Sequence, residues 1–140
     1  MASGFTIDTS AISEYQKRLL KASNQFVDFE KRFLQTLANM ALEKVLPRTP
    51  VDTGNLRRSW KVSKVSQKGD TVEITLYNDA RSDGVDESYA SYIEYGHFTR
   101  NRTSWVEGRF MLTVSTDELV REMTSVWNRM FNEWVKEMGL

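Results

Sequence analysis

The sequence has no cysteine, a single histidine and two prolines among its 140 residues. Without cysteine, the chain cannot form a disulfide, a zinc ribbon, an iron–sulfur site or a thiol nucleophile. The one histidine, His97, cannot supply a histidine-based metal cluster within a single chain. We therefore expect no metal centre and no cofactor.

An excess of charge of one sign is missing as well, and so is a long apolar run. Nineteen basic and nineteen acidic residues give a formal net charge of zero, which argues against a compact nucleic-acid binder with a basic surface. No stretch approaches the roughly 20 apolar residues that a membrane-spanning helix needs. The first residues also lack the basic start and apolar core of a signal peptide. We expect a soluble protein that makes no contact with a membrane.

Apolar residues are nevertheless plentiful enough for a core. The chain is 40% hydrophobic and contains 7 Phe, 5 Tyr and 4 Trp, so general disorder is excluded. Domains cluster at roughly 100–150 residues, and we expect residues 1–140 to form a single domain.

The N-terminal region, residues 1–46, is predicted to be helical. Its apolar residues recur in steps of three and four from Phe26 to Met40, as a helical period requires. The pattern predicts one long helix, or two with a break near Ser23, ending before Pro47. A helix this long in a small domain is expected to project from it or to pack along a neighbouring subunit.

A second helix is predicted over residues 115–140. Ser115 and Glu118 have the spacing of a capping box at its start. An apolar stripe then repeats every three or four residues, which predicts a buried face. Its members are Leu119, Met123, Val126, Met130 and Trp134.

The region between the helices, residues 47–114, is predicted to begin with a turn and a hairpin. Thr71–Tyr77 alternates apolar and polar residues as a half-buried strand does. The strand before it places Val62 and Val65 on opposite faces unless a bulge intervenes. Gly69 lies at the centre of the turn between the two strands.

The remainder of this region is less regular. Residues 89–96 fit either a strand or a short helix, and the polar segments 78–88 and 97–108 are expected to be loops. The order of elements indicates an α+β fold, in which a long N-terminal helix and a C-terminal helix pack on a small antiparallel β-sheet.

Charges are distributed unevenly along the middle of the chain. Segment 48–68 holds six basic residues against one acid, and segment 69–94 holds seven acids against one base. Three interpretations stay open: the segments pair within one subunit, they meet between subunits of a ring, or the basic segment contacts nucleic acid. The candidate interface residues are basic on one side and acidic on the other: Arg57, Arg58, Lys61 and Lys64 against Asp83, Asp86 and Glu87.

No residue set has the composition and spacing of a catalytic site. Glu94 and His97 could form an acid–base pair, but no nucleophile or orienting third group accompanies them. Asp79 begins a segment that faintly resembles a calcium loop, yet its third and twelfth positions are Arg81 and Ala90, so the ligand set fails. We expect a protein that is not an enzyme and has no catalytic residues.

Two motifs carry a family resemblance. The first is Thr49-Pro-Val-Asp-Thr-Gly-Asn-Leu-Arg-Arg-Ser-Trp, and the second is Tyr89-Ala-Ser-Tyr-Ile-Glu-Tyr-Gly. In this order, between two helices, they resemble a family of small structural proteins of long-tailed bacteriophages and prophages. These are the neck or tail-completion proteins, also called head–tail joining or minor capsid proteins. The resemblance covers most of the chain.

The resemblance implies a virion structural protein without enzymatic activity, assembled in the bacterial host into a ring at the head–tail junction. Its partners would be further copies of itself and neighbouring neck and tail proteins, with the genome passing nearby but not bound specifically. A nucleic-acid-binding accessory protein that uses segment 48–68 is the alternative. The motif positions are expected to shape the fold: Thr49, Pro50, Asp52, Thr53, Gly54, Leu56, Ser59, Tyr89, Glu94, Tyr95 and Gly96.

The residues of the first motif suggest how they would do so. The two prolines and Gly54 are expected to fix the turn from helix into sheet. Asp52 and Thr53 can cap this turn, and Leu56 and Trp60 would anchor it in the core.

The chain departs from the family pattern at two places. His97 and Phe98 stand where a threonine is expected after the second motif, and the usual proline before the final helix is absent from 109–112. The segment between Gly96 and Arg109 therefore has no template.

Overall fold

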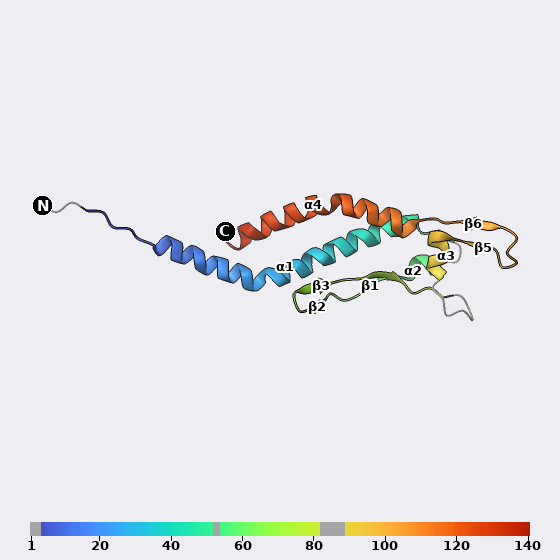
Figure 1. Ribbon diagram of the computed structural model, residues 1–140, viewed down its shortest axis with the longest axis horizontal. Coiled ribbons are helices and arrows are strands. Elements are labelled where there is room, and N and C mark those ends of the chain that lie inside the picture. Colours follow the sequence, from blue (N-terminus) through green and yellow to red (C-terminus); the bar gives the residue numbers. More distant parts are fainter. Residues whose placement is uncertain (1–3, 52–53, 82–88) are drawn as a thin grey trace.

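The computed structural model describes residues 4–51, 54–81 and 89–140. It is an elongated α+β structure (Figure 1) with two long helices, α1 (Ser10–Arg48) and α4 (Met111–Glu137). The helices lie side by side, and the four strands β1 (Trp60–Val62), β2 (Ser66–Lys68), β3 (Thr71–Glu73) and β4 (Leu76–Asn78) follow the other side of α1. The α+β class expected from the sequence is confirmed.

Helix α1 is continuous over 39 residues, without a break at Ser23. The expected end before Pro47 is wrong, because the proline lies inside the last turn. Carbonyl groups at the end of a helix lack partners within it, and here side chains supply them. The Thr49 hydroxyl donates to the Val45 carbonyl at 2.7 Å, and Arg48 donates to the Lys44 carbonyl at 3.4 Å. These bonds close the turn around the proline.

The half of the helix pair that lies away from the motifs has an aromatic core, here called the distal core. Its buried members are Ala22, Phe29 and Trp134. Phe29 is 1% exposed, and its ring lies 5.2 Å from those of both Trp127 and Trp134. The apolar stripes of the two helices therefore face each other here.

The predicted hairpin forms, and a bulge interrupts it. The turn at Gly69 joins β2 to β3, with Ser66 opposite Glu73, and farther along Val62 lies opposite Leu76. Three residues separate Val62 from Ser66, whereas two separate Glu73 from Leu76, so the first strand carries one extra residue. A bulge of this kind lets both Val62 and Val65 be half-buried.

Residues 89–96, left open between strand and helix, form helix α3 (Tyr89–Tyr95). The loop expected over 97–108 is wrong, because β5 (Gly96–Phe98) and β6 (Trp105–Glu107) form a second hairpin. Phe98 lies opposite Trp105, with 5.0 Å between the ring centroids. Cross-strand aromatic pairs stabilise short hairpins, which explains why so polar a segment forms strands. Of segment 78–88, residues 82–88 lie outside the described residues.

Helix α4 begins at Met111, four residues before the expected start. The predicted capping box at Ser115 and Glu118 is wrong. Ser115 is fully buried inside the helix, and its hydroxyl donates to the Met111 carbonyl at 2.5 Å. Glu118 forms an ion pair with Arg48 of α1 instead, at 2.6 Å. The Ser115 hydroxyl also accepts a hydrogen bond from Nη1 of Arg48 at 3.1 Å, so both residues help to pair the two helices.

Candidate functional site

The first motif is organised by the side chain of Thr49, which is 1% exposed. Its hydroxyl donates to the Val45 carbonyl and accepts from Nε1 of Trp60 at 2.8 Å. The Thr49 carbonyl accepts a hydrogen bond from Nη2 of Arg57 at 3.0 Å. One residue therefore connects the end of α1, the short helix α2 (Asn55–Arg58) and the first strand.

The remaining described residues of this motif form the turn that enters the sheet. Gly54 precedes α2 with φ +82°, in the left-handed region that favours glycine. Leu56 is 7% exposed in the same cluster as Trp60, so the prediction that both anchor the core is confirmed. The Ser59 hydroxyl donates to the Asn55 carbonyl at 2.7 Å. Asp52 and Thr53, the predicted caps, lie outside the described residues, and Pro50 is half-buried.

The second motif caps the final helix. Glu94 is 4% exposed, and its carboxylate accepts hydrogen bonds from the backbone amides of Leu112 and Thr113 at 2.9 and 2.8 Å. The Thr113 hydroxyl donates to the same carboxylate at 2.7 Å. The first amides of a helix lack partners within it, and a negative charge is favourable there. Glu94 of α3 supplies both the hydrogen-bond acceptor and the negative charge, although it lies 18 residues before Leu112 in the sequence.

Two glycines let the chain pass closely beside this cap. A Cβ atom on Gly96 would lie 2.6 Å from the Val106 carbonyl, and one on Gly108 would lie 2.5 Å from the Glu94 carbonyl. Gly96 also has φ +88°. Gly96 is thus required where β5 passes β6, and Gly108 is required where the chain after β6 passes the end of α3.

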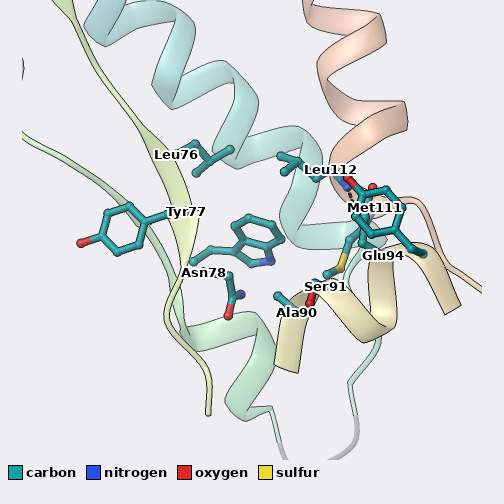
Figure 2. A pocket seen from close by; sticks show the side chains of 10 residues that line it. Leu76, Tyr77, Asn78, Ala90, Ser91, Glu94, Met111 and Leu112 are labelled. Carbon is teal, nitrogen blue, oxygen red and sulfur yellow. Dashed lines mark hydrogen bonds between the residues drawn. The ribbon is translucent and has the colours of Figure 1, made fainter. Parts of the chain in front are cut away.

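The two motifs meet at a cavity of about 300 Å³ (Figure 2). Trp60 of β1, Asn78 of β4, Ala90 and Glu94 of α3 and Met111 of α4 line it. Figure 2 shows Ala90, Met111 and Glu94 gathered on the side that α3 and the start of α4 form, facing Leu76 and Asn78 of the strand. The cavity is mainly apolar, and the one charge on its wall is engaged in the helix cap. The place where the two motifs meet is therefore a structural junction between β1, β4, α3 and α4.

The tyrosines of the second motif lie at the surface. Tyr89 is 38% exposed and Tyr95 is 65% exposed. Tyr89 lines a surface hollow together with Phe98 of the β5–β6 hairpin, and the ring of Tyr95 lies 6.5 Å from that of Phe110, so the second motif combines a buried cap with exposed aromatic side chains.

The basic residues predicted for a subunit interface differ in their surroundings. Arg57 is half-buried against Thr49, and within the described part of the chain its Nε has no hydrogen-bond partner. Lys61 forms an ion pair with Asp79, which raises the pKa of the lysine, chiefly through the hydrogen bond. Arg58 and Lys64 are exposed. Their acidic counterparts Asp83, Asp86 and Glu87 lie outside the described residues.

Glu94 and His97, considered as an acid–base pair, have separate partners. Glu94 binds the start of α4, and Nδ1 of His97 lies 3.2 Å from the Tyr92 carbonyl. Within residues 4–51, 54–81 and 89–140, no cluster of three or more metal-binding side chains occurs. The helices in these ranges include none with the length and apolar character of a membrane span.

Two features of the site escaped the sequence analysis. Asn78 joins the motif turn to the strand, donating to the Leu56 carbonyl at 2.8 Å and accepting from the Ala80 amide at 2.9 Å. Charged residues also join the two long helices, where the hydrogen bond from Arg48 lowers the pKa of Glu118. The spacing of residues along the chain gives no signal for either contact, because both join distant segments.

A comparison with family models gives one match. The sequence matches the family described as "Bacteriophage HK97-gp10, putative tail-component" over residues 13–96. The match spans 84 of the 140 residues and includes both motifs, whereas residues 97–140 lie beyond it. No curated protein and no solved structure matches the chain at a significant level.

Proposed function

Because this chain belongs to the HK97-gp10-like family of bacteriophage tail components, we propose that it is a structural protein of the virion at the head–tail junction. It completes the tail there and lets the tail join the head. Its role rests on contacts between subunits and not on turnover of a substrate. Family membership carries this proposal, together with the internal junction that the two motifs build.

The nature of that junction supports a scaffold. Thr49 and Glu94 are both buried, and their polar groups bind backbone or side-chain groups of this chain. A site for a substrate needs polar groups that are available to it. At the motif junction the named polar groups are already used to hold α1, β1, α3 and α4 together.

Subunits would assemble into a ring, in which the exposed charges take part. Arg58 and Lys64 are exposed and would face an acidic segment of a neighbour that contains Asp83, Asp86 and Glu87. Opposite charges on two faces of one subunit favour the correct neighbour and register. Arg57 is a poor choice for testing this contact, because its substitution would also disturb Thr49.

The alternative role, nucleic-acid binding by segment 48–68, has less support. Arg48, Arg57 and Lys61 of this segment bind groups of their own chain. Binding to phosphates requires basic side chains that are available at the surface, and of the six basic residues in this segment that role would fall to Arg58, Lys64 and Lys68, which are exposed.

The proposal can be tested by deleting the gene from the phage or prophage that encodes it. We expect heads filled with DNA and separate tails in electron micrographs, and a large loss of infectious particles. Purified protein added to the mutant lysate should restore joined particles, and protein with a label on its C-terminus should be found at the neck. Joined particles at normal titre without the gene would overturn the proposal.

A further inference from the structure

A surface hollow of about 630 Å³ lies at the end of the molecule that carries α3 and the β5–β6 hairpin (Figure 1). It shares no lining residue with the cavity at the motif junction. Among the described residues its wall contains no acid, and it is mainly aromatic and basic: Tyr89 and Tyr92 of α3, with His97, Phe98, Arg100 and Arg102 of the hairpin. Its volume is in the range of ligand sites.

The hairpin part of this wall lies beyond the segment that the family model matches. That match ends at Gly96, and the hairpin residues that line the hollow follow it. Family membership therefore does not account for the hollow, and its chemistry has to be read from its own residues.

The rings at the hollow are held edge to face. The centroids of Tyr92 and His97 lie 5.8 Å apart at 71°, and those of Phe98 and the neighbouring Trp105 lie 5.0 Å apart at 76°. Edge-to-face packing fixes the orientation of two rings without stacking one flat face on the other. Tyr92, Phe98 and Trp105 are nevertheless 36%, 61% and 47% exposed. Flat aromatic surface is thus available here in a fixed orientation.

The hairpin tip presents Arg102 from an unfavourable backbone conformation. Its φ is +56°, in the left-handed region where glycine or asparagine is preferred. Its amide donates to the Thr99 carbonyl at 2.7 Å, and Oδ1 of Asn101 accepts from the Thr103 hydroxyl at 2.7 Å, so the tip is ordered by its own hydrogen bonds. Unfavourable conformations in an ordered segment cluster at functional sites. A side chain at this position therefore points to a role for the guanidinium group.

The same tip is locally basic. The ion pairs of the described chain include neither Arg100 nor Arg102. Of the two acids in α3 and the hairpin, Glu94 is buried and binds the amides at the start of α4, and Glu107 lies at the base of the hairpin, away from the tip. The acids of segment 82–88 lie outside the described residues.

We propose that this hollow binds a single strand of nucleic acid, without preference for sequence. Bases of the strand stack on the exposed rings, and Arg100 and Arg102 contact its phosphates. Bases in a duplex are stacked on one another, so their faces are not available to these rings. An acidic peptide would satisfy the arginines but would leave the flat rings of Tyr92 and Phe98 without a partner.

The site differs from the basic segment 48–68 considered above. The chain has no net charge, so the contact is local and its affinity depends on the hollow itself. The inference goes beyond the proposed function and does not depend on it. Deletion of the gene and labelling of the virion report on the neck whether or not the hollow binds a strand.

The first experiment measures fluorescence anisotropy of a labelled oligothymidylate of about 12 nucleotides with the full-length chain. We expect micromolar binding at low salt that weakens as the salt concentration rises. A duplex of the same length should bind roughly tenfold more weakly, because it offers phosphates without open base faces. Absence of binding to the single strand at low salt would overturn the proposal, and so would equal binding of the duplex.

A competition experiment distinguishes the strand from an acidic protein segment. Polyglutamate with the same number of negative charges should not displace the oligonucleotide at equal concentration, since it has no rings to stack. Displacement by polyglutamate would overturn the proposal and would indicate an acidic segment of another protein as the occupant.

Substitutions in the hollow separate binding from folding. Arg100→Gln with Arg102→Gly removes both guanidinium groups, and Phe98→Leu removes one stacking surface while keeping an apolar contact with Trp105. Each variant should bind the oligonucleotide roughly tenfold more weakly. The melting temperature of the arginine variant should not fall, because glycine is favoured at φ +56°. Wild-type affinity in both variants would overturn the proposal.

A matched control removes two positive charges elsewhere. Lys64→Gln with Lys68→Gln changes two exposed lysines of the basic segment and lowers the net charge by the same amount as the arginine variant. It should bind the oligonucleotide as the wild type does. A loss as large as that of the arginine variant would place the binding in net charge or in segment 48–68, and would overturn the assignment to the hollow.

Discussion

The two cores of this molecule are held together by different means. In the distal core, rings from α1 and α4 pack on one another, and Phe29 contacts Phe26, Trp127, Phe131 and Trp134. The motif core surrounds Val45, Trp60 and Met111, and it includes the three buried polar residues of the described chain, Thr49, Glu94 and Ser115.

This difference determines what each core can tolerate. Apolar packing depends on volume and area, and similar side chains can replace one another at moderate cost. Hydrogen bonds depend on direction, and a buried donor or acceptor that loses its partner is costly. The family motifs lie in the second kind of core, which is consistent with a signature that fixes specific residues. The distal core is expected to specify helix pairing with fewer constraints.

The largest effect is expected from Phe29→Ala, which removes the ring at the centre of the distal core. Truncation of a buried aromatic residue costs about 3–5 kcal/mol, and Phe29 is 1% exposed. The free energy of unfolding from urea titration measures this loss. Phe5→Ala is the matched control, because Phe5 is 88% exposed and its removal should cost less than about 0.5 kcal/mol. Equal losses for the two variants would contradict the packing described for α1 and α4.

The next largest effect is expected from Glu94→Ala in the motif core. This change leaves the amides of Leu112 and Thr113 without their acceptor and should cost about 2–4 kcal/mol, since two partly buried donors lose a charged partner. Glu94→Gln keeps one acceptor oxygen and should cost less. Hydrogen exchange at the two amides should accelerate in Glu94→Ala. Glu107 is exposed, so Glu107→Ala is the control and should leave this exchange unchanged. If exchange at the two amides does not accelerate in Glu94→Ala, the cap described here is wrong.

The same contrast explains what the sequence reveals. The helical stripes that form the distal core follow a period of 3.6, and this regularity predicted both helices. The alternation of Thr71–Tyr77 predicted the half-buried strand, and the misfit of Val62 and Val65 indicated the bulge. Contacts that repeat along one element can therefore be predicted from the order of residues.

The motif core was predicted less well, because its contacts join distant segments. Ser115 and Glu118 have the spacing of a capping box, but the acceptor at the start of α4 comes from Glu94. The spacing therefore predicted the wrong start for this helix. The β5–β6 hairpin was missed because its stabilising pair, Phe98 and Trp105, lies across a polar tip. Leu56 and Trp60 were predicted correctly to be anchors in the core, since burial of large apolar side chains is favourable.

A smaller loss is expected from Thr49→Val, which keeps the volume of the side chain and removes its hydroxyl. Nε1 of Trp60 then loses its acceptor, at a cost of about 1–3 kcal/mol for a buried donor. Thr49→Ser should retain most of the stability. The double variant Thr49→Val with Trp60→Phe removes both partners, so its loss should be smaller than the sum of the two single losses. Additive losses would show that the two side chains do not interact.

The smallest effect is expected at the surface, where Arg48 and Glu118 join the two helices. The hydrogen bond from Arg48 lowers the pKa of Glu118 below its usual 4.5. A carboxylate with a lowered pKa in the folded state stabilises the fold above its unfolded pKa, and this contribution is lost as the pH falls through the folded pKa. Glu118→Gln should therefore melt slightly below the wild type at neutral pH, and the two melting temperatures should converge in acid below 4.5. Glu14→Gln, which breaks only the exposed pair between Glu14 and Lys17 near the start of α1, serves as the control and should follow the wild type at both pH values. A difference for Glu118→Gln that persists unchanged in acid would mean that the hydrogen-bonded charge is not its cause.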